Sequence, residues 1–186
     1  MRIVAGTHKR RVITPPPNFK ARPTTDFAKE NLFNVLANYV DFDDITVLDL
    51  FAGTGSISYE FASRGATQVT SVELNPLHHK FIVQTIDKLK LDNIKPIQTN
   101  AFIFLRQMAR KLTFDVIFAD PPYDMENREQ IVNLILDNDM LNSDGLIIIE
   151  HSSQDDYSEN KHLLEHRKYG SVNFSIFSKN NQNPEQ

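Results

Sequence analysis

The architecture of this chain is indicated by Val47-Leu48-Asp49-Leu50-Phe51-Ala52-Gly53-Thr54-Gly55-Ser56, in which an apolar strand runs into a Gly-x-Gly turn and then a helix. Glycine tolerates positive φ and has no Cβ, so the backbone of such a turn can approach a ligand closely. The first N–H groups of the helix that follows have no partner within the helix and can bind a carboxylate or a phosphate. The segment therefore predicts a ligand of the nucleotide type at the end of a buried strand.

The same turn discriminates between adenosine ligands. The dinucleotide fingerprint G-x-G-x-x-G needs a small third residue, and Ser58 stands at that position. Asp49 lies in the strand end, where its carboxylate would repel a pyrophosphate but suits a ligand with an amino group and a sulfonium. S-adenosylmethionine is such a ligand. We expect it to contact Asp49, Phe51, Ala52, Gly53 and Gly55. An NAD-dependent oxidoreductase on a similar sheet is the alternative.

Two further strands end next to polar residues. Glu73 ends the run 68–73, and a carboxylate there offers two acceptors to the two hydroxyls of an adenosine ribose. Asn100 follows the run 94–98, where it can read an adenine edge or simply cap the next helix. The expected cofactor contacts therefore also include Glu73, Leu74, Asn100 and Ala101.

The motif Asp120-Pro121-Pro122-Tyr123 ends the apolar run 114–119. Proline fixes φ, has no N–H and restricts the residue before it, so this loop is stiff. Asp120 and a backbone carbonyl beside a proline can accept both hydrogens of an exocyclic amine, and Tyr123 offers a ring for stacking. The four residues predict a catalytic site for an amino group on a flat ring, with Asp120 also touching the cofactor. An ordinary turn after a strand is the other interpretation.

The order of elements predicts an α/β fold. Strand-like runs alternate with helix-compatible segments, which is typical of a parallel sheet covered on both faces. The expected strands are 46–50, 68–73, 94–98, 114–119 and 145–150, and the expected helices are 56–64, 76–91, 101–110 and 126–138. Residues 166–169 and 172–177 predict an antiparallel hairpin added to this sheet. Ligands in such folds lie at the carboxyl ends of the strands.

Composition narrows the function. The 186 residues are enough for one domain with a sizeable core, and they include no cysteine, which excludes disulfides, thiolate metal sites and a thiolate nucleophile. No metal is expected, because the six histidines lack ligand spacing; His78 and His79 are predicted to be solvated. No apolar run is long enough to span a membrane and no secretory signal is seen, which predicts a cytoplasmic protein. Nothing requires more than a monomer.

The net charge of −4 conceals a basic N-terminus. Residues 1–25 contain six basic residues and no acid, and a small β-hairpin is predicted to turn near Gly6. Such a cluster can neutralise RNA phosphates, although a solubilising tail is the alternative. Pro15-Pro16-Pro17 is expected to act as a stiff spacer. The predicted organisation is an RNA-binding extension over 1–24, a catalytic domain over 25–178 and a disordered tail over 179–186. The expected RNA contacts are Arg2, Lys9, Arg10, Arg11 and Arg22.

Taken in order, the motifs resemble the RsmD family of bacterial methyltransferases. They are Arg2-Ile3-Val4-Ala5-Gly6, Arg22-Pro23-Thr24-Thr25-Asp26, Asp49-Leu50-Phe51-Ala52-Gly53-Thr54-Gly55, Ser63-Arg64-Gly65-Ala66 and Asp120-Pro121-Pro122-Tyr123. The resemblance implies a class I methyltransferase (Rossmann-like) fold with seven strands, S-adenosylmethionine as methyl donor, and methylation of the N2 amine of a guanine in 16S ribosomal RNA. The implied substrate is a partly assembled small ribosomal subunit.

One departure from this family pattern concerns Phe27 and Ala28, which stand where the family often has an arginine. Arg22 and Lys29 are the candidates to replace its contact. Two other functions stay open at this point. The same loop equally serves adenine N6 or cytosine N4 in DNA, and the chain could be an RNA-binding module without catalysis. The mechanism that we favour is direct transfer of the methyl group to the amine, without a covalent enzyme intermediate.

Overall fold

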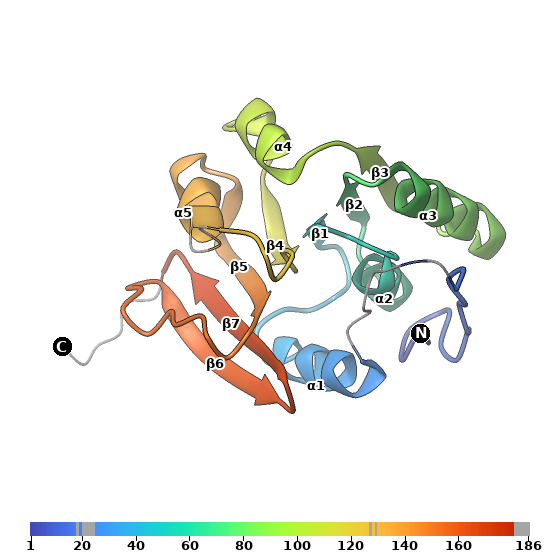
Figure 1. Cartoon of the computed structure of the whole chain (residues 1–186), viewed down its shortest axis with the longest axis horizontal. Coiled ribbons are helices and arrows are strands. Elements are labelled where there is room, and N and C mark those ends of the chain that lie inside the picture. The colour runs from blue at the N-terminus through green and yellow to red at the C-terminus, as the bar shows by residue number, and fades with distance from the viewer. Residues whose placement is uncertain (18, 20–24, 127, 129, 181–186) are drawn as a thin grey trace.

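The computed structural model describes residues 1–17, 19, 25–126, 128 and 130–180 of the chain. Within them, seven strands form one sheet in the order β3-β2-β1-β4-β5-β7-β6 (Figure 1). The strands are β1 Thr46–Leu50, β2 Gln68–Glu73, β3 Ile94–Gln98, β4 Phe114–Ala119, β5 Leu141–His151, β6 Leu163–Tyr169 and β7 Val172–Ser178. Strands β3, β2, β1, β4 and β5 are parallel, and β7 is antiparallel to both β5 and β6. The predicted α/β sheet with an antiparallel C-terminal hairpin is confirmed.

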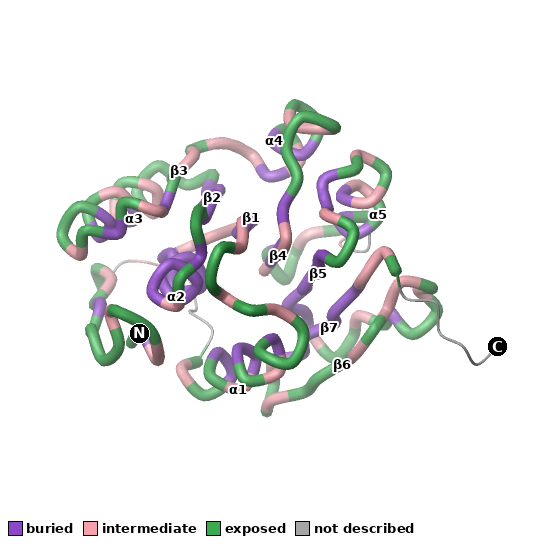
Figure 2. The backbone as a smooth tube through the Cα atoms, turned by 180° about the vertical axis from the view of Figure 1, so that it is seen from behind, coloured by how far each residue is buried: buried purple, intermediate pink, exposed green. Residues whose placement is uncertain are grey.

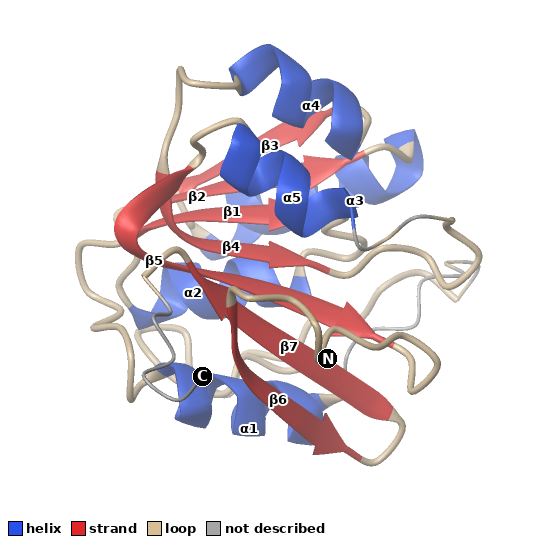
Figure 3. Ribbon diagram, turned by 90° about the vertical axis from the view of Figure 1, so that its left-hand side faces the viewer, coloured by secondary structure: helices blue, strands red, loops and turns tan. Residues whose placement is uncertain are grey.

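The helices cover both faces of this sheet. They are α1 Asp26–Leu36, α2 Ser56–Arg64, α3 Pro76–Leu89, α4 Ala101–Met108 and α5 Gln130–Asp137. Figure 3 shows helices on both faces of the sheet. Buried residues of α1, α2 and α3 share one apolar cluster, and those of α4 and α5 share a second. Because successive side chains of a strand point to opposite faces, Val47 joins the first cluster and Leu48 the second. The ends of the central strands therefore stay open for a site.

Local sequence explains where three helices begin. The side chain of Thr25 accepts a hydrogen bond from Ala28 N at the start of α1, and Asn75 accepts from the first turn of α3. Pro76 stands at the first position of α3, where a missing N–H costs nothing. Asn100 caps α4 in the same way as Asn75 caps α3. These caps satisfy N–H groups that a helix leaves unpaired.

Among the predicted boundaries, the starts of β5 and α5 were furthest from the observed ones. Strand β5 begins at Leu141, earlier than the predicted 145, because Leu141 pairs with Phe114 beyond an irregularity in the ladder. The polar residues 142–144 hid this extension, since they lack the apolar pattern that marks a buried strand. Helix α5 begins at Gln130 and not at 126, because the loop from β4 continues through a turn in which Met125 N donates to the Pro122 carbonyl.

Residues 1–13, called the N-terminal arm below, fold back on themselves as the sequence predicts. Arg2 and Val12 form an antiparallel bridge, and Ile3 N donates to the Arg11 carbonyl at 3.0 Å. The arm does not stand apart from the domain, however. Ile3 and Ile13 are buried within the apolar cluster of α1 to α3. The proline segment therefore does not hold the arm away from the domain, contrary to the prediction.

The arm is fastened to α2 by polar contacts. The fully buried carboxylate of Glu60 accepts hydrogen bonds from Val4 N at 2.8 Å and from Ala5 N at 3.0 Å. Gly6, with φ of 79°, lies so close to α2 that a Cβ on it would be 1.7 Å from the Ser63 carbonyl oxygen. Helix α2 is consequently covered on both sides, and Figure 2 shows it buried along most of its length.

Candidate functional site

A cavity of about 790 Å³ lies at the carboxyl ends of the central strands. Its volume is in the range of small-molecule sites, which is about 300–1,000 Å³. The sequence-predicted residues that line it are Asp49, Phe51, Ala52, Gly53, Glu73, Leu74, Asn100, Ala101, Asp120, Pro121, Pro122 and Tyr123. The structure thus brings together both sets of predicted side chains, those proposed for the cofactor and those proposed for catalysis.

The glycine turn forms the floor of one end of this cavity. Gly53 and Gly55 have φ of 57° and 81°, and Phe51 shares this left-handed region with φ of 62°. A non-glycine residue held in this conformation costs energy and is often found at functional sites. Gly55 does not itself line the cavity; its lack of a Cβ makes room for Tyr59, whose ring would be 2.6 Å from that atom. The role of Gly55 is therefore to shape the turn.

Asp49 is buried at the base of the turn. Its Oδ2 accepts hydrogen bonds from Ser58 N at 3.1 Å and from Ser58 Oγ at 2.5 Å. Burial nevertheless raises the pKa of Asp49 to about 7, and the charge of Glu73 acts in the same direction. Ser58, which breaks the dinucleotide fingerprint, thus orients a carboxylate. That carboxylate gains most from a cationic ligand, because a positive charge would offset its desolvation.

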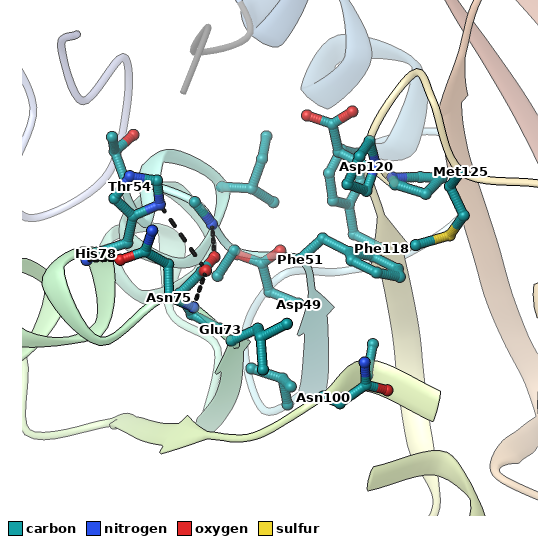
Figure 4. Close-up of a pocket in the computed structure, with 18 of the residues that line it drawn as sticks. Asp49, Phe51, Thr54, Glu73, Asn75, His78, Asn100, Phe118, Asp120 and Met125 are labelled. Atoms are coloured by element: carbon teal, nitrogen blue, oxygen red, sulfur yellow. Dashed lines mark hydrogen bonds and ion pairs between the residues drawn. The ribbon is translucent and has the colours of Figure 1, made fainter. Parts of the chain in front are cut away.

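Glu73 ends β2 and connects the glycine turn to α3 (Figure 4). Its Oε2 accepts a hydrogen bond from Gly53 N, and its Oε1 accepts one from Asn75 N, each at 2.7 Å. His78 Nδ1 lies 3.8 Å from the same Oε1. The carboxylate is therefore fixed in the cavity wall before any ligand arrives. Each of its oxygens still has a second acceptor position, which a hydroxyl group can use.

His78 was predicted to be solvated, and the structure shows that this was wrong. Its side chain is 15% exposed, lines the cavity and packs against the ring of Phe19, with centroids 4.7 Å apart. The prediction missed this because the first turn of α3 points back toward the strand ends, a direction that depends on tertiary packing. Asn100 caps α4 by accepting from Phe102 N and Ile103 N, so only its NH₂ group is left for a ligand.

The segment Asp120-Pro121-Pro122-Tyr123, called the Asp120 loop below, forms the opposite end of the cavity (Figure 4). Asp120 N donates to the Leu50 carbonyl of β1 at 3.5 Å, which holds the start of the loop against the glycine turn. Tyr123 is 58% exposed at the rim. Burial raises the pKa of Asp120 well above its usual range, and the nearby charges of Glu150 and Asp49 add to this effect. A carboxylate that is desolvated and repelled by neighbouring negative charges favours a partner that donates hydrogen bonds to it.

Glu150 was not predicted as a functional residue. Ala119 of β4 pairs with Ile149 of β5, so the next residues along the two strands, Asp120 and Glu150, are neighbours. An acid that follows an apolar strand was the signal used for Glu73, and it applies equally to Glu150. Glu150 does not line the cavity itself. The lining residues that sequence reasoning missed are Thr54, Ser56, Ile57, Val72, Asn75, Pro76, His78, Thr99, Phe118, Asp124 and Met125. Most of them adjoin predicted residues, whereas apolar Ile57 and Phe118 gave no signal.

Four of the five predicted RNA-binding residues, Arg2, Lys9, Arg10 and Arg11, lie on the arm. Arg2, Lys9 and Arg10 line a second cavity together with Arg64, which was not predicted. Arg11 is exposed, and Arg22 lies outside the described residues. In the described part of the chain, no group of three or more histidine, cysteine or acidic residues could hold a metal ion. Over the same residues, no helix is both long and apolar enough to cross a membrane.

The sheet order and the glycine turn after β1 define a class I methyltransferase fold. A dinucleotide-binding sheet has the order 3-2-1-4-5-6, whereas here β7 is inserted antiparallel between β5 and β6. The solved structure of yhhF from Escherichia coli matches with a TM-score of 0.81 and 31% identity, over 95% of this chain and 96% of that one. A hypothetical protein from Thermus thermophilus has the same fold, with a TM-score of 0.84, 24% identity and coverage of 96% and 99%.

Residues 1–178 match the family model described as "Conserved hypothetical protein 95", and the chain belongs to that family. A protein from Haemophilus influenzae named "Ribosomal RNA small subunit methyltransferase D" is 32% identical over 95% of this chain and 93% of its own length. The Escherichia coli K12 protein of the same name is 33% identical over 81% of this chain and 74% of its own length. The resemblance to RsmD proteins is confirmed, and it extends over the arm and the domain together.

Proposed function

We propose that this protein transfers a methyl group from S-adenosylmethionine to the N2 amine of a guanine in 16S ribosomal RNA. The observation that carries the proposal is the pairing of two kinds of chemistry in one cavity. One end has a glycine turn and the carboxylates Asp49 and Glu73, and the other has the Asp120 loop. The relatives named ribosomal RNA small subunit methyltransferase D support the choice of RNA.

The residues at the first end fit S-adenosylmethionine. Asp49, with a pKa raised by burial to about 7, suits a ligand carrying an ammonium group. Glu73 can accept hydrogen bonds from the ribose hydroxyls. Gly53, whose N–H donates to Glu73, has no side chain and so leaves room for the ribose beside that carboxylate. The NH₂ group of Asn100 can donate to a ring nitrogen of adenine. When bound, this cofactor supplies an electrophilic methyl group on a sulfonium.

The residues at the second end would hold the substrate amine. Asp120 accepts a hydrogen bond from one N–H of the amine. We assign the second N–H to the Pro121 carbonyl, because the Pro122 carbonyl already accepts a hydrogen bond from Met125 N. These two bonds favour a pyramidal nitrogen whose lone pair faces the methyl group. Tyr123 would stack on the base, which has to leave its RNA stack at a cost of a few kcal/mol.

The arm supports a substrate that is RNA within the small ribosomal subunit or an assembly intermediate. Arg2, Lys9, Arg10 and Arg11 stand on it, and Lys29 lies at its base. Lys29 is buried and donates to the Arg2 carbonyl at 2.6 Å, so it positions the arm and does not replace the family's arginine as a surface contact. We further propose that the protein acts as a monomer in the cytoplasm, where ribosomal subunits are assembled.

The proposed function can be tested by substrate identity. Labelled S-adenosylmethionine would be supplied with unmodified small-subunit particles, with free 16S ribosomal RNA, or with unmethylated duplex DNA, and the products digested to nucleosides. We expect labelled N2-methylguanosine from the particles. Label in N6-methyladenine or N4-methylcytosine from the DNA would replace this function with a DNA methyltransferase. Cofactor binding without transfer to any nucleic acid would contradict the whole substrate assignment.

A further inference from the structure

A second cavity, of about 280 Å³, lies between the N-terminal arm, α1 and the end of α2. Its charged lining consists of Arg2, Lys9, Arg10 and Arg64 against a single acid, Glu30, and Asn34 adds a side-chain amide. Glu60 offsets the charge of Arg64, and Asp26 lies 3.9 Å from Arg2 Nε, so the excess positive charge of the cavity comes mainly from Lys9 and Arg10. Like charges repel one another at such distances, so the arrangement is stabilised by an anion that enters it.

Arg64 is the most firmly held of these cations. Its Nε donates to Glu60 Oε1 at 2.9 Å, and its Cζ lies 4.5 Å from the centre of the Phe33 ring and 5.2 Å from that of Phe42. Only 13% of its side chain is exposed. The bond to Glu60 uses one of the five donors of the guanidinium, and the planar fork suits bidentate binding of a phosphate.

Glu60 fixes both walls of the cavity at once. The carboxylate that orients Arg64 also accepts the N–H groups of Val4 and Ala5, which line the same cavity from the arm. Because one fully buried side chain holds both walls, their separation is set before a ligand binds. A site that is built in advance spends less free energy on ordering its own groups when it binds.

The local backbone of the arm explains how Lys9 and Arg10 reach the cavity. Its backbone has φ of 71°, and Arg10 N donates to the Ile3 carbonyl at 2.9 Å. Long side chains rarely adopt this left-handed conformation, and it persists where the surroundings impose it. The turn that imposes it, closed by Lys9 N donating to the Gly6 carbonyl, places Lys9 and Arg10 at the cavity.

We propose that this cavity binds a backbone phosphate of the RNA, a few nucleotides from the methylated base. This inference rests on the proposed function. The position supports it, because the arm connects the two cavities: Met1 Sδ lies 3.4 Å from Thr54 Oγ1 in the glycine turn, and Arg2 is the next residue. Arg64 ends α2, about 12 Å along the helix from Ser56 beside that turn. Phosphate contacts of this kind set the register of the RNA without reading its sequence.

The test is a pair of matched double variants. In the first, Lys9→Gln and Arg10→Asn remove two charges from the cavity, and asparagine tolerates the left-handed conformation of residue 10. In the control, Arg110→Asn and Lys111→Gln remove two charges after α4, where Arg110 also has a positive φ of 57°. A third variant, Asn34→Asp, adds a negative charge to the cavity and removes none. Binding of a labelled 16S ribosomal RNA transcript would be titrated at several salt concentrations.

For the first variant we expect RNA binding about tenfold weaker, and a slope of log K against log salt shallower by about 1. Asn34→Asp should also weaken binding, and the control pair should match the wild type. Heats of S-adenosylhomocysteine binding, unchanged in all variants, would show that they are folded. Titration with inorganic phosphate distinguishes an RNA-phosphate site from a site for free phosphate. A site for free phosphate would bind inorganic phosphate saturably, and the variants would leave the salt slope of RNA binding unchanged.

The outcomes separate this inference from the proposed function. If the wild type methylates ribosomal RNA and the first variant binds RNA with the slope and affinity of the control pair, the phosphate site is refuted and the enzyme assignment stands. If the wild type binds the transcript but transfers no methyl group to small-subunit particles, the proposed function fails, and the salt slopes still decide whether the cavity binds phosphate. Saturable binding of inorganic phosphate together with unchanged slopes would also refute the proposal.

Discussion

The two ends of the large cavity differ in how far the protein completes them by itself. At the glycine-turn end, Glu73 accepts backbone N–H groups from Gly53 and Asn75, and Asp49 accepts two hydrogen bonds from Ser58. At the other end, Tyr123 is 58% exposed and stands at the rim. The cofactor end is preformed, whereas the substrate end offers surface that only a bound base would cover. Each of the following changes tests this division.

The largest effect is expected from Asp120→Ala. Methyl transfer should fall by about 10²–10³-fold or more, because the amine loses the acceptor that fixes its geometry. The affinity for S-adenosylhomocysteine, measured by calorimetry, should stay within a few fold of the wild type. Glu126→Ala, which removes an exposed acid just beyond the loop, is the matched control and should be active. Near-normal turnover in Asp120→Ala would remove this residue from the catalytic role.

Glu73→Ala should affect the other end of the cavity first. The change removes the proposed ribose acceptor and frees the N–H groups of Gly53 and Asn75, so we expect the dissociation constant of S-adenosylhomocysteine to rise by about 10²-fold. Glu73→Gln keeps one acceptor and should be intermediate. Calorimetry measures both constants. An unchanged constant in the alanine variant would contradict the ribose role.

Tyr123→Ala should weaken substrate use with little effect on the cofactor. Stacking of a base on an aromatic ring contributes about 1–3 kcal/mol, so KM for the RNA substrate should rise by roughly 10-fold or more. Tyr123→Phe keeps the ring and should behave like the wild type. If the phenylalanine variant lost as much as the alanine variant, the hydroxyl group and not the ring face would be the functional part.

The smallest effects are expected with pH, through Asp49. A cationic ligand prefers the ionised carboxylate, and burial raises the pKa of Asp49 to about 7, so binding of S-adenosylhomocysteine should strengthen a few fold as pH rises through 7. The free energy of unfolding of the protein without ligand should instead fall as pH rises toward 7. Because the folded pKa is above the unfolded one, this group contributes stability below about pH 4 that is lost as pH approaches and passes 7.

Asp49→Asn is the matched control for that pH dependence, since asparagine keeps an oxygen for Ser58 but does not titrate. Thermal unfolding and calorimetry at about pH 5.5 and about pH 8, the two sides of the raised pKa, would be compared in both proteins. In the variant, neither the affinity for S-adenosylhomocysteine nor the free energy of unfolding should show this dependence on pH. Equal slopes in the two proteins would show that another group titrates.

The sequence could predict a functional residue where the position of that residue follows from its neighbours along the chain. The glycine turn and the Asp120 loop lie at strand ends, so their positions followed from local pattern and the parallel sheet. The sequence could not show that Ser58 would bond to Asp49, or that His78 would turn inward, because both depend on the packing of α2 and α3.

Residues far apart in sequence were the hardest to predict. Glu150 lies beside Asp120 only because β5 pairs with β4, and Arg64 meets the arm only because Glu60 binds both. The basic residues of the arm were visible as a charge pattern, but the pattern gave no sign that they enclose a cavity with a partner from α2. Such juxtapositions are set by tertiary contacts that no local pattern records.

The contact between the arm and α2 also fixes an order of events during translation. Residues 1–13 are made about 50 residues before Glu60 and Ser63, which provide their docking site. At about 5–20 residues per second, the ribosome needs several seconds to reach them. Over that time Ile3 and Ile13 have no core to enter. The arm thus has to wait for α2 before it can settle, and a nascent chain that stalls before α2 would expose an apolar and positively charged segment to the ribosome that made it.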